Sequence, residues 1–130
     1  MRIVVLGCGT GVGKTRLSAA LLRALASRGM PALGLKPIES GVARAAHSEG
    51  PPPGSDADTL AQAGSLQTVA PHPLYALATP VSPHLAARMA GVQLELPRIR
   101  DWVERAERAV TPHVMPHMAL WSVIETAGGV

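Results

Sequence analysis

The stretch Gly7-Cys-Gly-Thr-Gly-Val-Gly-Lys-Thr15 decides how the first part of this chain folds. Before it, the apolar run Arg2-Ile-Val-Val-Leu6 predicts a fully buried strand of the kind found in parallel sheets. After it, leucines recur at helical spacing from Lys14 to Arg28, and Gly29 stands where a glycine commonly ends a helix. A strand, a glycine-rich turn and a helix in this order are the context that a phosphate-binding loop requires.

The chemistry of this turn supports the same interpretation. Glycines allow several backbone N–H groups to point at phosphate oxygens, and the N-terminus of the helix adds a favourable potential. Lys14 supplies a mobile positive charge, and the Thr15 hydroxyl can coordinate Mg²⁺. The strict motif has glycine five positions before Gly13, where this chain has Cys8. We expect phosphate binding here because the neighbouring strand and helix are both in place.

The rest of the sequence predicts further strands and helices. Ala32-Leu-Gly-Leu-Lys36 predicts a second strand, stopped by Pro37. Residues 41–55 are rich in glycine and proline, which predicts a surface loop. The other predicted elements are a helix from Ser55 or Asp56 to about Ala63, a helix from Ser82-Pro83 to about Ala90, an amphipathic helix at Pro97–Val110 and a buried strand at Met118–Ile124.

These elements predict an α/β fold of the P-loop NTPase type, with a parallel sheet and flanking helices. We expect one domain over residues 1–130, because this length is too short for two independent cores. A parallel sheet of three strands has two open edges and buries little apolar surface. We therefore expect this sequence to be the N-terminal part of a longer domain.

The composition excludes several classes of protein. With 47% hydrophobic and 16% charged residues, the chain is too apolar for a disordered tail. Its first apolar run is far too short for a membrane span or a signal peptide, and a single cysteine excludes an internal disulfide framework. The net charge of +3 comes from basic residues scattered among acidic ones, which argues against a nucleic-acid surface. We expect a soluble cytoplasmic protein that binds neither membranes nor nucleic acid.

Lysine is rare in this chain, and its positions are informative. Ten arginines accompany only two lysines, Lys14 in the glycine-rich loop and Lys36 at the end of the second predicted strand. An ammonium group is a compact charge, whereas a guanidinium group is a wide planar fork, so a crowded phosphate site can require lysine. We expect Lys36 to act beside Lys14 on one bound anion. The alternative is a lysine at a strand end that reaches into solvent.

One acidic residue, Glu125, lies at a predicted strand end. The carboxyl ends of parallel strands line the ligand crevice of α/β sheets, and here those ends are Gly7, Lys36 and Glu125. Glu125 is therefore a candidate Mg²⁺ ligand or a carboxylate that orients water. Asp56 could supply a further oxygen to the metal, although its spacing fits a plain helix cap equally well.

Five motifs, taken together, resemble dethiobiotin synthetase. In chain order they are Gly7-Cys-Gly-Thr-Gly-Val-Gly-Lys-Thr15, Lys36-Pro-Ile-Glu-Ser-Gly41, Ser55-Asp-Ala57, Ser82-Pro-His-Leu-Ala-Ala87 and Glu125-Thr-Ala-Gly-Gly129. The resemblance covers the whole chain and implies a homodimeric cytosolic enzyme of biotin synthesis. Such an enzyme uses ATP and Mg²⁺ to convert 7,8-diaminononanoate and CO₂, through a carbamate and its mixed phosphoric anhydride, into a cyclic urea.

The resemblance also implies roles for individual residues. Thr15, Asp56 and Glu125 would hold Mg²⁺. Lys36, Lys14 and Thr10 would be catalytic, and Ser40 and Lys36 would bind the substrate. The residues that would bind the nucleotide and its metal are Gly11, Val12, Gly13, Lys14, Thr15, Arg16, Asp56, Glu125, Thr126, Ala127 and Gly128.

Members of that family continue well beyond the glutamate motif, and their later segments supply the adenine pocket and much of the dimer interface. We therefore expect the 130-residue chain alone to bind ATP weakly and to turn over little. Two other functions remain open at this stage. One is an ATPase switch of the partition or site-placement type, and the other is a relative that amidates substrates of the cobyrinic acid type.

Overall fold

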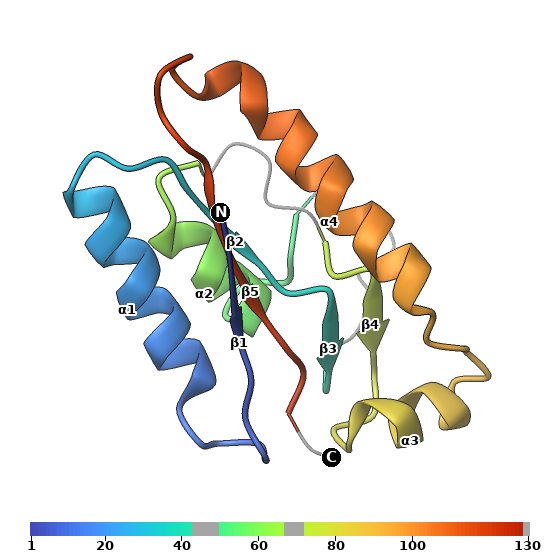
Figure 1. Ribbon diagram of the computed structural model, residues 1–130. Coiled ribbons are helices and arrows are strands. Elements are labelled where there is room, and N and C mark those ends of the chain that lie inside the picture. Colours follow the sequence, from blue (N-terminus) through green and yellow to red (C-terminus); the bar gives the residue numbers. More distant parts are fainter. Residues whose placement is uncertain (43–49, 67–71, 129–130) are drawn as a thin grey trace.

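The computed structural model describes residues 1–42, 50–66 and 72–128. Its main sheet has three parallel strands in the order β1 (Arg2–Val5), β5 (Trp121–Glu125) and β2 (Ala32–Leu35). The register places Val5 beside Glu125 and Leu35 beside Ile124. The carboxyl ends of the three strands therefore lie side by side at one end of the sheet, and the chain segments that follow them begin there (Figure 1).

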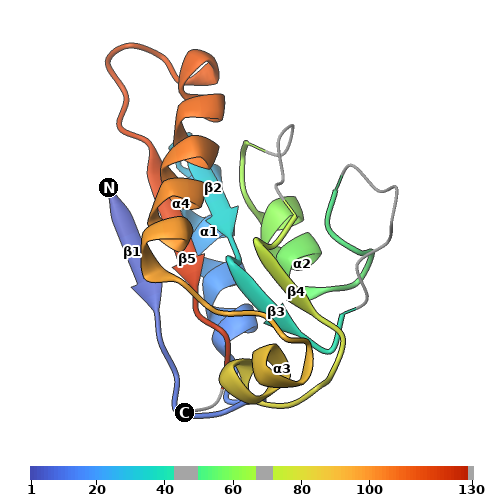
Figure 2. The ribbon, with the colours of Figure 1, turned by 90° about the vertical axis from the view of Figure 1, so that its right-hand side faces the viewer.

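Helices cover both faces of this sheet. On one face, α1 (Lys14–Ser27) and α2 (Asp56–Ala63) pack on β2 and β5, and the core there includes Leu22, Leu60 and Val123. On the opposite face lies α4 (Leu96–Val110) (Figures 1 and 2). Its Trp102 and neighbouring apolar side chains form a second core with Leu33. Successive residues of β2 alternate between the two cores, as the geometry of a strand requires.

The close approach of α2 to β2 depends on Gly34. A Cβ atom built on Gly34 would lie 2.6 Å from the backbone oxygen of Leu60 and 2.8 Å from Cδ1 of Leu22. Only a residue without a side chain fits between the strand and the helix. Gly34 thus fixes the position of α2, the helix that begins at Asp56.

A second sheet, which we did not predict, consists of the parallel strands β3 (Ile38–Ser40) and β4 (Tyr75–Leu77). Pro37 ends β2, as predicted, but the chain continues in extended conformation and the Pro37 carbonyl accepts a hydrogen bond from the N–H of Tyr75. Proline removes a donor and leaves the acceptor in place, so it is compatible with a change from one sheet to the next. The remaining elements are α3 (Pro83–Met89), below the strand ends in Figure 1, and the short 3-10 helix η2 (Thr111–His113).

The predicted α/β fold with a parallel sheet and flanking helices is confirmed, and all four predicted helices are present. The prediction that Arg2–Leu6 is fully buried was wrong. β1 lies at an edge of the sheet, so Arg2, Val4 and Leu6 are exposed while Val5 is buried. The last strand begins at Trp121 rather than at Met118, whose N–H closes a turn on Met115. Of the predicted loop 41–55, residues 43–49 lie outside the described residues.

Within the described ranges, none of the helices combines the length and the apolar character that a membrane crossing requires.

An ion pair links the edge strand β1 to α4. Arg2 donates from Nε to Glu107 Oε1 at 2.9 Å and from Nη2 to Oε2 at 2.7 Å, and the Ser122 hydroxyl donates to the same Oε1 at 2.8 Å. The hydrogen bond from Arg2 is the largest influence on the pKa of Glu107, which lies below its ordinary value although partial burial opposes the shift. The ionised form of Glu107 is thus favoured in the folded chain.

We expect stability to depend on pH through this pair. Because the pKa of Glu107 is lower in the folded than in the unfolded chain, its contribution is complete above the unfolded pKa and disappears as the pH falls through the folded value. Glu107→Gln should lower the free energy of unfolding by about 0.5–1 kcal/mol at pH 7. In urea unfolding, the difference in free energy of unfolding between wild type and Glu107→Gln should disappear below about pH 4. Asp101→Asn, on the exposed face of α4, is the control. A difference that stays constant with pH would contradict this assignment.

Candidate active site

The glycine-rich loop connects β1 to α1 and turns its backbone at two glycines. Gly11 and Gly13 have positive φ angles of 75° and 92°, which L-residues rarely adopt. Gly13 is the N-cap residue of α1. Because glycine has no side chain, it cannot cap the N–H groups in the first turn of the helix. These N–H groups and the helix dipole favour an anion at this position.

Lys14 folds back across the loop. Its side chain is buried, and Nζ donates to the carbonyl oxygen of Gly9 at 2.6 Å. Two glycines make room for it: a Cβ on Gly7 would lie 2.8 Å from Lys14 Cδ, and a Cβ on Gly128 would lie 3.0 Å from Lys14 Nζ. The loop and the segment after β5 therefore hold the Lys14 ammonium group between them.

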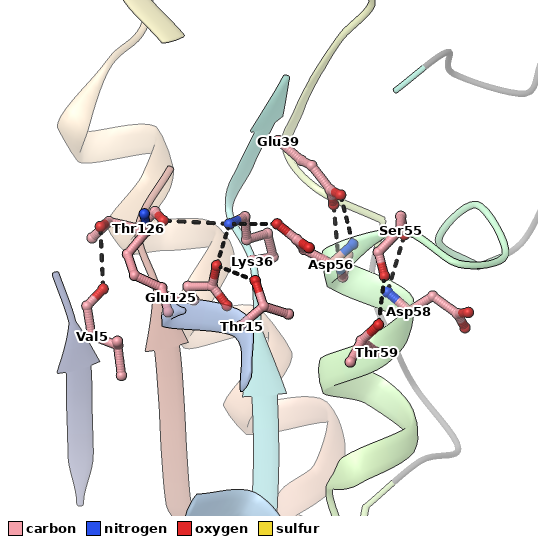
Figure 3. Close-up of polar contacts among 12 residues, drawn as sticks. Val5, Thr15, Lys36, Glu39, Ser55, Asp56, Asp58, Thr59, Glu125 and Thr126 are labelled. Atoms are coloured by element: carbon pink, nitrogen blue, oxygen red, sulfur yellow. Dashed lines mark hydrogen bonds and ion pairs between the residues drawn. The ribbon is translucent and has the colours of Figure 1, made fainter. Parts of the chain in front are cut away.

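Lys36 contacts two carboxylates, that of Glu125 at the end of β5 and that of Asp56 at the start of α2. Its Nζ donates to Glu125 Oε1 at 2.6 Å, to Asp56 Oδ2 at 3.3 Å and to the backbone oxygen of Thr126 at 3.4 Å (Figure 3). The Thr15 hydroxyl donates to the same Glu125 Oε1 at 2.8 Å. Lys36 is 4% exposed and Glu125 1% exposed, whereas the Asp56 side chain is 46% exposed. We call Thr15, Lys36, Asp56 and Glu125 the carboxylate cluster.

The carboxylate cluster offers donors suited to a divalent cation. Glu125 Oε2 is buried and accepts no hydrogen bond from any described residue, so one carboxylate oxygen is available. The Thr15 hydroxyl and the half-exposed Asp56 carboxylate supply two more oxygens. The residues described include no group of three or more His, Cys, Asp or Glu side chains placed to hold a metal ion. Two carboxylates and one hydroxyl, from Glu125, Asp56 and Thr15, fit Mg²⁺, because this ion is usually bound by one or two carboxylates together with water and phosphate oxygens.

Most of the predicted site residues line one cavity. Its volume is about 290 Å³, and it combines the loop, the two lysines and the carboxylate cluster. Its lining residues are Thr10, Gly11, Gly13, Lys14, Thr15, Arg16, Lys36, Asp56, Glu125 and Gly128. Both lysine side chains therefore border the same space, beside the first turn of α1.

Four predicted residues lie apart from this cavity. Val12 is exposed and does not line it. The hydroxyl and the N–H of Thr126 both donate to the Val5 carbonyl, so this residue ties the segment after β5 back to β1. Ser40 and Ala127 line an adjoining cavity of about 80 Å³ that also borders Thr10. Ser40 and Thr10 further border a larger hollow of about 530 Å³ beside Pro80, Val81 and Ser82.

Sequence reasoning missed Glu39, which lies next to Ser40 on β3. Its carboxylate is buried and accepts hydrogen bonds from the N–H groups of Asp56 at 2.7 Å and Ala57 at 3.1 Å. Burial raises the pKa of Glu39 above its ordinary value, although the two N–H donors act in the opposite direction. The only signal in the sequence was an acidic residue inside a short extended segment directly after Lys36 and Pro37.

Comparisons with known proteins support the resemblance inferred from the motifs. A family model described as an AAA domain matches residues 1–130. The ATP-dependent dethiobiotin synthetase BioD of Anaeromyxobacter sp. (strain K) is 40% identical, over 98% of this chain and 50% of that protein. The protein of the same name from Nitrosospira multiformis is 40% identical, over 75% of this chain and 40% of its own length. The chain thus spans about half the length of the first curated relatives it matches.

Proposed function

We propose, because this chain belongs to the AAA domain family and is similar to curated dethiobiotin synthetases along nearly its whole length, that it acts in the ATP-dependent formation of dethiobiotin. The observation that carries the proposal is the cavity shared by the glycine-rich loop, both lysines and the carboxylate cluster. The substrates would be 7,8-diaminononanoate, CO₂ and ATP, and the product a cyclic urea.

The proposed reaction has three steps. One amine of the substrate adds to CO₂ and loses a proton, which gives a carbamate. An oxygen of the carbamate attacks the γ-phosphorus of ATP, so that a mixed carbamic–phosphoric anhydride forms and ADP leaves. The second amine then attacks the carbamoyl carbon, which closes the urea ring and releases inorganic phosphate. Phosphoryl transfer of this kind asks mainly for positioning and charge stabilisation from the protein.

Groups of this chain would supply both the positioning and the charge stabilisation. The N–H groups around Gly11 and Gly13 would hold the phosphates, and Lys14 would exchange its bond to the Gly9 carbonyl for a phosphate oxygen. Lys36 would neutralise the carbamate and the transferred phosphoryl group. Thr15, Asp56 and Glu125 would hold Mg²⁺, which when bound neutralises charge on the phosphates.

The diamine would lie next to the phosphate cavity. Ser40 and Thr10 border the hollow beside α3, and the smaller cavity joins Ser40 to Lys36. A substrate lying there would place its reacting nitrogen close to the Lys36 ammonium group. We further propose that residues 1–130 belong to one P-loop domain, that the protein is a cytoplasmic homodimer, and that the 130-residue chain alone turns over little substrate.

A chimaera tests this function directly. Residues 1–130 would be joined to the remaining half of the Anaeromyxobacter sp. (strain K) relative, and cyclic urea and ADP would be measured with diaminononanoate, bicarbonate, Mg²⁺ and ATP. We expect equal amounts of both products, and little of either from the 130-residue chain. A folded chimaera that hydrolyses ATP without forming the urea would overturn the proposal. Tight, adenine-selective binding of ATP by the 130-residue chain in calorimetry would contradict our expectation of weak binding.

Within an active chimaera, Lys36→Arg should lower turnover roughly 10-fold, below the ~100- to 1,000-fold lost when such a donor is removed altogether. The charge is retained, but the wide guanidinium group does not fit among three oxygen atoms at a site only 4% exposed. Arg23→Lys, on the exposed surface of α1, makes the reverse exchange and is the matched control. Unchanged turnover in Lys36→Arg would refute the role given to Lys36.

A further inference from the structure

Glu39 crosses from the second sheet to the first turn of α2. One carboxylate oxygen accepts the N–H of Asp56 at 2.7 Å, and the other accepts the N–H of Ala57 at 3.1 Å (Figure 3). The residue is 5% exposed. Both oxygens of the buried Glu39 carboxylate thus accept hydrogen bonds from the first two backbone N–H groups of α2.

The same helix has a second cap of the ordinary kind. Ser55 is the N-cap residue, and its hydroxyl accepts the N–H of Asp58 at 3.1 Å. The two caps therefore serve different groups: Ser55 satisfies the third residue of the helix, whereas Glu39 holds the first two. Burying a carboxylate is costly even when it is hydrogen-bonded, and a serine cap alone is a common way to begin a helix.

Glu39 also belongs to the segment that carries Lys36. The ammonium group of Lys36 contacts the Asp56 carboxylate at 3.3 Å, and Glu39, three residues later, holds the Asp56 backbone. Residues 36–39 therefore contact Asp56 at both its side chain and its main chain. Because the Asp56 side chain is half-exposed, few neighbours restrict it, and its position depends on these two contacts.

We propose that Glu39 is a positioning residue, which holds Asp56 beside Lys36 and Glu125, where Asp56 and Glu125 would bind a divalent cation together. The inference rests on the proposed function, in which Asp56 is a ligand of that cation. Without the Glu39 carboxylate, the N–H groups of Asp56 and Ala57 lose their acceptors, and Asp56 can move away from Lys36 and Glu125. Partners of this kind, which orient a metal ligand without touching the metal, commonly change metal affinity strongly.

The test uses Mn²⁺ alone as the probe and the 130-residue chain, with free Mn²⁺ measured by electron paramagnetic resonance. Glu39→Gln keeps the shape of the side chain but turns an amide NH₂ toward one backbone N–H, so that donor faces donor. We expect its Mn²⁺ affinity to fall roughly 10-fold. Ser55→Ala removes the other cap of the same helix and should leave the affinity within about twofold of wild type, although both variants lower the melting temperature.

Asp56→Asn completes the experiment. We expect it to weaken Mn²⁺ binding by itself, and the double variant with Glu39→Gln to bind no more weakly than Asp56→Asn alone, because Glu39 acts through Asp56. If Glu39→Gln binds as well as wild type, or if Ser55→Ala loses as much affinity as Glu39→Gln, the positioning role is overturned and the proposed function stands. If the wild-type chain binds no Mn²⁺, or Asp56→Asn binds like wild type, the metal assignment fails and this inference fails with it.

Discussion

Lys36→Met is expected to lower the free energy of unfolding by about 3–5 kcal/mol, the cost of leaving a buried charge without its partner. Glu125 is 1% exposed, and its closest cationic contact is Lys36 Nζ at 2.6 Å. Methionine fills a similar volume but brings no charge to the carboxylate. Thr15 still donates to Glu125 Oε1, yet a neutral hydroxyl replaces only part of what the ammonium group supplied.

A double-mutant cycle separates the lost charge pair from lost packing. Lys36→Met combined with Glu125→Leu removes both charges and leaves apolar groups of similar size, so we expect it to be more stable than Lys36→Met alone. Urea unfolding followed by circular dichroism at pH 7 gives each free energy. A double variant that is as unstable as the single one would mean that packing, and not the ion pair, explains the effect.

Gly34→Ala should destabilise the chain by about 3 kcal/mol, at the upper end of what overpacking usually costs. The new methyl group would lie 2.6 Å from the Leu60 carbonyl oxygen. A leucine side chain such as that of Leu22 can change its rotamer, but a backbone oxygen in the middle of α2 moves only if the helix moves. The cost therefore falls on the packing of α2 against β2.

Gly50→Ala is the matched control for this substitution. The same methyl group meets nothing within 4 Å there, so its effect on the melting temperature should be small. Thermal unfolding of the two variants, compared with wild type, gives the measurement. Equal melting temperatures for Gly34→Ala and Gly50→Ala would show that α2 is not held as closely as the structure indicates.

The sequence predicts the centre of the site better than its surroundings. The positions of Lys36 and Glu125 follow from one rule, that the carboxyl ends of parallel strands lie at the same end of a sheet. Lys14 follows from the glycine-rich loop after the first strand, and the structure places all three at one cavity. Asp56 joins them because the helix that it begins packs beside β2. Their catalytic and metal-binding roles stay predictions.

Three features could not be predicted, each for a physical reason. An apolar run such as Arg2–Leu6 indicates a strand but carries no information about how many neighbours that strand has, so its edge position was missed. β3 and β4 have three residues each, too few for a periodic pattern. The contact of Glu39 with Asp56 joins residues 17 positions apart across a loop rich in glycine and proline, where sequence spacing does not determine proximity.

The order of strands in the main sheet has a consequence for how the protein folds. In that sheet β1 and β2 lie on either side of β5, so the first strands of the chain are joined through the last one. Arg2 pairs with Ser122 across 120 positions, and Lys36 finds Glu125 only when β5 is in place. A nascent chain on the ribosome cannot complete this sheet until residue 125 has emerged, and such distant contacts are typical of slow folding.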